Sequence, residues 1–333
     1  MSLAMRITLL RQLTRVDLAR FGPKLAEALV TRSHQVKIRR SFVPRRTAAA
    51  DEAVALYRRL VQDRPGRHEV GLARALVAQG SVPDDRTVES ALAQGREAIG
   101  YVENATDRDG LVVLAAAQLM VAMQLRSDAP RDALPLANQA RETWLRCAPL
   151  GARERMELAR SLTVLGQCRA ALGEPAEALA AREEAVEVFR RLSLWTRLKY
   201  MPARLEAMSG LADSLASHRR WAEALTLATG AREDLTFMSR VEPLRFRPTL
   251  GSLLFVIARC HLGLREQDAA VAAAEEAVGH YRWLAEHDPV RYQPRLVIAL
   301  RTLAGTLNAL GLHEKAAWAT AEAEAEAEAT ESR

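Results

Sequence analysis

The chain of 333 residues is long enough for two average globular domains or for one extended array of repeats. Hydrophobic residues make up 49% of it and aromatic residues only 5%, which favours closely packed helices over strands, and no run of about 18 apolar residues predicts a membrane-spanning helix. The net charge of +6 is uneven, because residues 1–50 carry eleven Lys and Arg against two acidic residues.

The first predicted element, residues 6–13, has the pattern of a helix end. The segment 11–23, RQLTRVDLARFGP, aligns without gaps on the segment 282–294, RWLAEHDPVRYQP. Both finish with a basic residue, an aromatic residue and, two positions later, a proline. We therefore expect residues 1–22 to be a partial repeat or an N-terminal cap, and we favour a chain that is a piece of a longer protein.

The stretch 36–46, VKIRRSFVPRR, gathers basic side chains around Phe42. It is suited to gripping nucleic-acid phosphates or to contacting an acidic protein surface. A solvated loop between two helices, or a face that docks a neighbouring domain, explains the same pattern without either function. The basic residues of this patch are Lys37, Arg39, Arg40, Arg45 and Arg46.

Residues 23–150 are expected to form irregular repeats that include this basic stretch. Alanine pairs seven residues apart occur in steps of 42 and 45, and GSVPDDRT interrupts a unit between 80 and 130. The first unit keeps Ala53 but has Arg46 in place of the paired alanine.

Residues 151–330 repeat in regular steps of 46. Pro202, Pro248 and Pro294 are each preceded by a basic residue and an aromatic residue, as in Arg245-Phe246 and Arg291-Tyr292. Because proline suits the first turn of a helix, we expect each proline to begin the first helix, helix A, of a helix pair. The aromatic residue before it should be buried at the joint between consecutive units.

Small residues keep the same register in the second helix, helix B, of each pair. Two further features share this register: aromatic residues four positions after an alanine, and small residues twelve before it. The alanine pairs are Ala91/Ala98, Ala133/Ala140, Ala178/Ala185, Ala224/Ala231, Ala270/Ala277 and Ala316/Ala323; the aromatic residues are Tyr57, Trp144, Phe189 and Tyr281; the small residues are Gly166, Ala212, Ala258 and Ala304. We expect these positions to face a neighbouring helix, and Ala181 to be exposed.

The arrangement Leu165-Gly166 … Ala178 … Ala185 resembles the small-residue skeleton of the tetratricopeptide repeat (TPR) family. The repeat here is longer than the family's usual length of roughly 34 residues, and Leu162 replaces a tryptophan early in helix A. The resemblance covers residues 20–330. The longer repeat is similar to the long-helix TPR variants of bacterial multidomain regulators. The resemblance implies an all-α, right-handed α-solenoid of about seven TPR-like helix pairs, forming a single continuous solenoid.

Catalytic signatures are absent from the sequence, which contains no GxGxxG, GxxxxGK[ST] or GxSxG. Cys260 and His261 are neighbours and would point apart on a helix. The pairs Glu183-Glu184 and Glu275-Glu276 recur in phase, as expected of a solvated outer face. Three scattered cysteines without a CxxC predict reduced thiols in a cytoplasmic protein. We therefore predict no enzyme activity, no metal and no cofactor.

The alternating segment 321–329, AEAEAEAEA, is predicted to be helical, because alanine and glutamate form helices well and strands poorly. Glutamates four residues apart repel, so a frayed polar end is expected, with an acidic contact for a basic partner as the alternative.

The TPR resemblance implies that ligands bind on the concave face formed by the A helices. A non-catalytic scaffold for a protein or peptide segment is therefore the predicted function, alone or as the sensor or assembly arm of a larger bacterial regulator. The alternative is a nucleic-acid-associated regulator that uses the basic stretch. A second copy of the chain is a further candidate partner. The partner-binding residues predicted on the A helices are Arg160, Gln167, Glu206, Asp213, Phe255, Arg259, Arg301 and Asn308.

Overall fold

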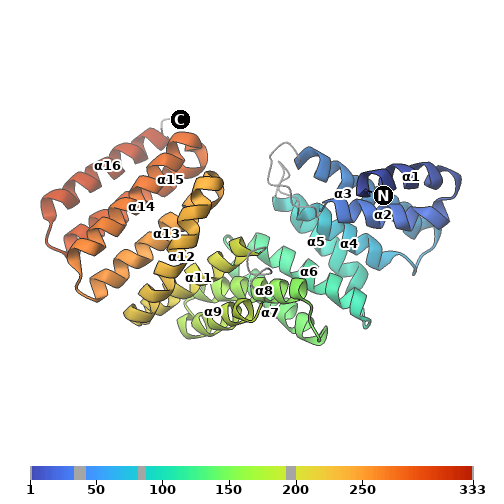
Figure 1. Ribbon diagram of the computed structural model, residues 1–333, viewed down its shortest axis with the longest axis horizontal. Coiled ribbons are helices and arrows are strands. Elements are labelled where there is room, and N and C mark those ends of the chain that lie inside the picture. Colours follow the sequence, from blue (N-terminus) through green and yellow to red (C-terminus); the bar gives the residue numbers. More distant parts are fainter. Residues whose placement is uncertain (1, 34–42, 82–87, 193–199, 332–333) are drawn as a thin grey trace. The chain divides into compact units, whose positions relative to one another are not determined.

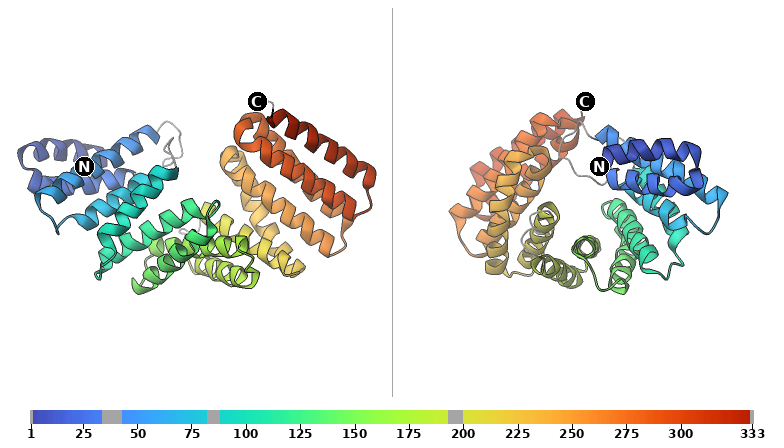
Figure 2. Two further views of the ribbon diagram at one scale, coloured as in Figure 1. Left: turned by 180° about the vertical axis from the view of Figure 1, so that it is seen from behind. Right: turned by 45° about the vertical axis from the view of Figure 1, so that its right-hand side comes forward.

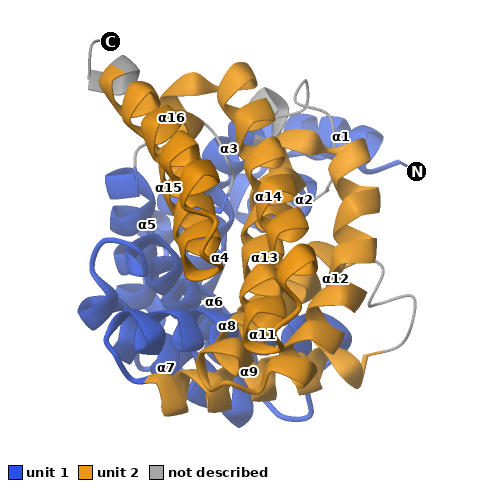
Figure 3. Cartoon of the chain, turned by 90° about the vertical axis from the view of Figure 1, so that its left-hand side faces the viewer, with its two compact units in different colours: residues 1–174 blue, residues 175–333 orange. Residues whose placement is uncertain are grey.

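The computed structural model describes residues 2–33, 43–81, 88–192 and 200–331. This part of the chain contains fifteen helices and no strand (Figure 1). The helices belong to two compact units, residues 1–174 and residues 175–333, coloured separately in Figure 3.

Unit 1 is built from eight helices within its described residues, and each packs against the next along the chain. The helices α2, α4, α6 and α8 also contact one another in succession, so they form one layer. The eight helices are α1 (Leu3–Val16), α2 (Leu18–Ser33), α3 (Val43–Asp63), α4 (Glu69–Gly80), α5 (Val88–Val102), α6 (Arg108–Leu125), α7 (Pro130–Arg146) and α8 (Ala152–Ala171).

Unit 2 repeats this plan with longer and more uniform helices. From α11 onward each helix packs against its successor, as the yellow-to-red helices show in Figure 2, and α11, α13 and α15 form the layer of A helices. The helices described in this unit are α9 (Pro175–Arg190), α11 (Met201–Ser217), α12 (Trp221–Val241), α13 (Pro243–Gly263), α14 (Gln267–His287), α15 (Pro289–Ala309) and α16 (His313–Glu331). The predicted all-α solenoid of TPR-like helix pairs is confirmed.

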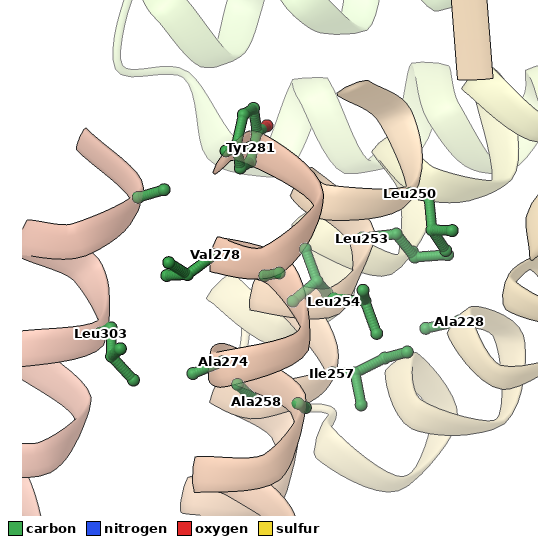
Figure 4. Packing of buried hydrophobic residues seen from close by; sticks show 14 of the residues in the cluster. Ala228, Leu250, Leu253, Leu254, Ile257, Ala258, Ala274, Val278, Tyr281 and Leu303 are labelled. Atoms are coloured by element: carbon green, nitrogen blue, oxygen red, sulfur yellow. The ribbon is translucent and has the colours of Figure 1, made fainter. Parts of the chain in front are cut away.

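The predicted alanine positions are buried in both units. Each of the twelve paired alanines is at most 9% exposed, and so is Ala53. The four aromatic residues that follow an alanine by four positions are buried too. Figure 4 shows the resulting core of unit 2, in which Leu254 and Ile257 of α13 pack beside Ala228 of α12 and Ala274 of α14. Small side chains on helix B therefore allow the helices to approach closely.

The expected exposure of Ala181 is wrong, because this residue is only 5% exposed. Ala178, Ala181 and Ala185 are spaced by three and four residues, so they lie on one face of α9. All three are buried on that face.

The predicted start of helix A is also wrong in two of the repeats, both in unit 2. Pro202 lies at the start of α11, but α13 and α15 begin at Pro243 and Pro289, five residues before Pro248 and Pro294. A proline inside a helix cannot donate the hydrogen bond to the carbonyl four residues earlier. For Pro248 that carbonyl belongs to Leu244, and it accepts a hydrogen bond from the Tyr292 hydroxyl at 3.4 Å.

Two of the three joint aromatic residues are buried as predicted, whereas Tyr200, before Pro202, is only half-buried. Phe246 is 3% exposed and Tyr292 is 2% exposed. The arginine before each lies over its ring, at 5.1 Å for Arg245 and 5.4 Å for Arg291. The repeated basic–aromatic phrase therefore places a cation on the outer side of a buried ring.

The turns between helices A and B also repeat every 46 residues. Gly173, Arg219, Arg265 and Gly311 all have positive φ angles, between 59° and 78°. At each turn the amide of the following residue donates to a carbonyl five residues earlier, which ends the helix in a Schellman-type cap. Glycine adopts this backbone conformation freely, whereas arginine adopts it with strain.

One helix, α6, is long and apolar enough to cross a membrane by length and composition, with a mean hydropathy of 1.3. Of its 18 residues, 61% are buried within the structure. Its contacts with α4, α5, α7 and α8 explain that burial, which is typical of a core helix.

Candidate functional site

A pocket of about 730 Å³ lies on the layer of A helices in unit 1. Each of the four A helices of that layer contributes side chains, together with Trp144 at the end of α7 and the segment before α8. The lining residues are Glu27, Val30, Thr31, Arg74, Val77, Arg108, Val112, Val113, Ala116, Trp144, Pro149, Gly151, Ala152, Arg153, Glu154 and Glu157. The pocket thus combines an apolar wall with charged groups of both signs.

The apolar wall comes mainly from α6. Val112 and Ala116 are four residues apart, so they lie on one face of this helix, and both are half-buried. Val77 of α4 is half-buried beside them in the lining. These partly exposed side chains give a ligand apolar surface to cover.

The charged groups around the pocket are held by ion pairs within unit 1. Arg108 contacts Glu154 at 2.8 Å and donates to the carbonyls of Cys147 at 3.3 Å and Pro149 at 3.0 Å. Arg74 contacts Asp109 at 2.9 Å. These contacts keep the guanidinium groups in place at the pocket.

Trp144 is a lining residue that the sequence indicated only as part of the repeat. It is 2% exposed, and its indole Nε1 has no hydrogen-bond partner among the described residues. Buried tryptophan N–H groups usually find an acceptor.

Two predicted binding residues lie on α8, and one of them adjoins the pocket. Arg160 is paired at 3.0 Å with Glu157, which lines the pocket, and its other terminal nitrogen lies 3.0 Å from the sulfur of Met123. Gln167 lies two helical turns further along and is half-buried. The pocket itself was missed by sequence reasoning, because residues from four separate helices form it.

The other six predicted residues lie on the A helices of unit 2, and the structure brings two of them together. Arg259 of α13 contacts the carboxylate of Asp213 of α11 at 2.6 Å and its carbonyl at 3.1 Å. Phe255 is half-buried and stacks on Tyr281, with ring centroids 6.4 Å apart. The remaining three, Glu206, Arg301 and Asn308, are exposed.

A buried arginine extends the Asp213 pair toward α9. Arg182 donates to the carbonyl of Gly210 at 2.8 Å and to the hydroxyl of Ser214 at 2.7 Å, and it lies 3.5 Å from Asp213. Burial lowers the pKa of Arg182, and the charge of Asp213 opposes that shift. Asp213 therefore lies between two arginines and links three helices of unit 2.

The basic stretch lies largely outside the described residues. Lys37, Arg39 and Arg40 are not among them. Arg45 and Arg46 lie in the first turn of α3. The stretch therefore stays a sequence-based prediction.

The Cys260–His261 neighbours have separate environments. Cys260 is fully buried, and burial raises the pKa of its thiol. His261 contacts Glu266 through Nδ1 at 2.6 Å. Within the described ranges, no group of three or more His, Cys, Asp or Glu could hold a metal ion. Cys147 and Cys168 are likewise free and buried.

The sequence matches no family model and no curated relative. Several solved structures share its fold. BtubC (BKLC) from P. vanneervenii has a TM-score of 0.55 and 16% identity, over 75% of this chain and 94% of that chain. A Rap protein complexed with Competence and Sporulation Factor has a TM-score of 0.54 and 14% identity, over 91% of this chain and 77% of that chain.

A third similar structure is aspartyl phosphate phosphatase F from Bacillus subtilis. Its TM-score is 0.50 at 14% identity, over 86% of this chain and 72% of that chain. At such low identity these similarities concern the fold alone, which is the TPR-like helical solenoid.

Proposed function

We propose that the protein is a non-catalytic scaffold that binds a protein or peptide segment on the exposed face of its A helices. The observation that carries this proposal is the pocket of about 730 Å³ that α2, α4, α6 and α8 build together. A binding surface shared by successive repeat units suits an extended ligand that contacts several helices at once. The similar Rap structure, complexed with Competence and Sporulation Factor, supports the same use of the fold.

The lining chemistry favours a segment with an apolar side chain flanked by polar groups. Val77, Val112 and Ala116 would cover the apolar side chain. Arg153 and Glu27 are exposed charged groups of opposite sign at the pocket, and they would contact the polar flanks.

A peptide library displayed on phage tests this proposal. Peptides enriched on the wild-type chain would be synthesised, and their affinities measured by fluorescence anisotropy. Ala116→Trp should weaken binding at least tenfold. Ala116 is partly exposed in the pocket, so the indole ring would fill space that the peptide needs. Ala222→Trp is the matched control, since Ala222 is exposed on α12, away from the A-helix layers.

A second variant pair tests the predicted residues in unit 2. Arg259→Glu combined with Arg301→Glu should weaken capture several-fold, with a nearly unchanged melting temperature, if the ligand also crosses α13 and α15. Equal binding by wild-type, Ala116→Trp and the double variant would overturn the proposal. Tight, salt-dependent binding of random DNA, lost when Arg39, Arg40, Arg45 and Arg46 are changed to glutamate, would instead favour the nucleic-acid alternative.

The proposal that the scaffold is non-catalytic needs a separate test, because one similar structure is named as a phosphatase. The purified chain should release no phosphate from an aspartyl phosphate protein above the spontaneous rate. Catalysed release would contradict this part of the proposal.

A further inference from the structure

The outer face of α1 carries an apolar stripe that the described residues leave uncovered. Met5 is 63% exposed, Leu9 is 49% exposed and Val16 is 85% exposed. Their spacing of four and seven residues places them on one side of the helix, opposite the buried Ile7 and Leu10. An aligned stripe of this kind differs from single exposed apolar residues, which are common on protein surfaces.

The stripe on α1 is flanked by positive charge. Arg6 and Arg15 are exposed on either side of it, and α1 contains no acidic residue. Arg11, the third basic residue of the helix, is already paired with Glu52 of α3. Two arginines therefore remain on the outer face.

The outer face of α16 has the opposite charge. Trp318 is 62% exposed, and Ala321 and Ala325 continue its stripe at a helical spacing of three and four residues. Glu324 and Glu328 are exposed along this stripe. Because two other glutamates are held within unit 2, Glu322 by Arg282 and Glu326 by Gln293, the helix is firmly docked while its outer glutamates stay exposed.

We propose that α16 of one copy packs on α1 of a second copy. The apolar stripes would meet, with Trp318 and the small alanines opposite Leu9 and Val16. Glu324 and Glu328 lie one helical turn apart on the same side of the α16 stripe, where they would face one of the two arginines, Arg6 or Arg15, so the two surfaces have opposite charge. Since the two faces differ, the contact is heterologous, and repeated contacts would form short chains or a ring of copies.

The contact should be weak, reversible and sensitive to salt. A helix of 14 residues is roughly 21 Å long, so one helix-on-helix contact covers less area than a stable interface requires. Exposed arginine–glutamate pairs are also screened by salt. This inference does not depend on the proposed binding pocket.

Sedimentation velocity with the full chain over a range of concentrations tests the proposal. The average mass of the wild-type chain should rise with concentration at low salt and fall toward that of a single copy at high salt. Arg6→Glu with Arg15→Glu, and separately Glu324→Arg with Glu328→Arg, should each weaken association about tenfold or more. Mixing these two variants should restore association, because each then meets a face of opposite charge.

Two control variants keep the comparison matched in charge. Arg131→Glu with Arg146→Glu, and Glu103→Arg with Asp128→Arg, change exposed residues away from both helices by the same amounts. Both should associate like the wild-type chain. If they lose association as strongly as the variants in α1 and α16, net charge rather than this contact controls it, and the proposal fails.

Cross-linking tests the geometry directly. Gln12→Cys on one copy and Ala321→Cys on another should form a disulfide-linked pair when mixed, since both positions lie on the proposed seam. A linked pair formed equally well by Gln12→Cys alone would indicate an α1–α1 contact and overturn the proposal. A chain that stays a single copy at every concentration and salt level would overturn it as well.

Discussion

The joints between helix pairs differ between the two units, although the same sequence phrase occurs in both. In unit 2, Phe246 and Tyr292 are almost fully buried, and the Tyr292 hydroxyl donates to the carbonyl of Leu244, just before the preceding phrase. Tyr200, which has no such phrase 46 residues before it, is half-buried. In unit 1, Phe21 follows Arg20 in the same way, with the guanidinium 5.3 Å from the ring centroid, but Phe21 is only half-buried. The phrase alone therefore does not bury its aromatic residue.

Repeat length provides the physical reason for this difference. Unit 2 keeps a step of 46 residues, which places one phrase beside the previous one. In unit 1 the steps are 42 and 45 residues, and the helices from α4 to α7 have 12, 15, 18 and 17 residues, compared with 21 in each of α12 to α15. A constant step allows the same contact to recur, whereas a varying step changes the neighbour of each side chain.

Removing a joint aromatic residue should have the largest effect, and the effect should differ between units. Phe246→Ala should lower the free energy of unfolding by about 3–5 kcal/mol, the usual range for a buried phenylalanine. Phe21→Ala should cost less than half as much, because its ring is already partly exposed to water. Urea unfolding followed by circular dichroism measures both, and equal losses would refute the proposed difference between the joints.

Enlarging a paired alanine should cost the same in both units. Ala224→Leu in unit 2 and Ala98→Leu in unit 1 should each lower stability by about 1–3 kcal/mol, because both sites are fully buried and would be overpacked. Ala222→Leu, at an exposed position of α12, should have little effect in the same unfolding measurements. A large loss at Ala222, or none at Ala98, would show that the alanine register does not define the inner face.

Substitutions at the turns with positive φ should change stability by a smaller amount, and the sign should differ between the glycine and arginine positions. Gly311→Ala should cost roughly 1–2 kcal/mol, because a residue with a Cβ atom is disfavoured at positive φ. Arg219→Gly and Arg265→Gly should each stabilise unit 2, by about 1 kcal/mol or less, since the relieved strain exceeds the added flexibility of the unfolded chain. Thermal unfolding would reveal the shifts, and a destabilised Arg219→Gly would mean that the arginine side chain contributes more than its strain costs.

The exposed ion pairs should have the smallest effects in either unit. A double-mutant cycle on Arg259 and Asp213 in unit 2, and one on Arg74 and Asp109 in unit 1, should each give a coupling below about 1 kcal/mol. Both couplings should shrink as salt is added. A salt-independent coupling well above that value would identify a pair that contributes substantially to stability.

The sequence by itself determined the architecture of the protein. Its step of 46 residues, its paired alanines and its joint aromatic residues predicted helix pairs, and the paired alanines, Phe246 and Tyr292 are buried as expected. This succeeds because a repeat contacts mainly its neighbours, so that local spacing and local packing carry the same information.

Only the tertiary structure decided where the helices begin and which surfaces exist. Pro248 and Pro294 lie inside their helices. A proline within a helix leaves the carbonyl four residues earlier without its usual donor. For Pro248 that carbonyl belongs to Leu244, and the Tyr292 hydroxyl donates to it. The pocket could not be predicted, because Val77, Val112 and Glu157 come from three helices and meet only after folding. Surfaces shared by separate helices depend on how the helices pack, and that packing is not a property of any single repeat.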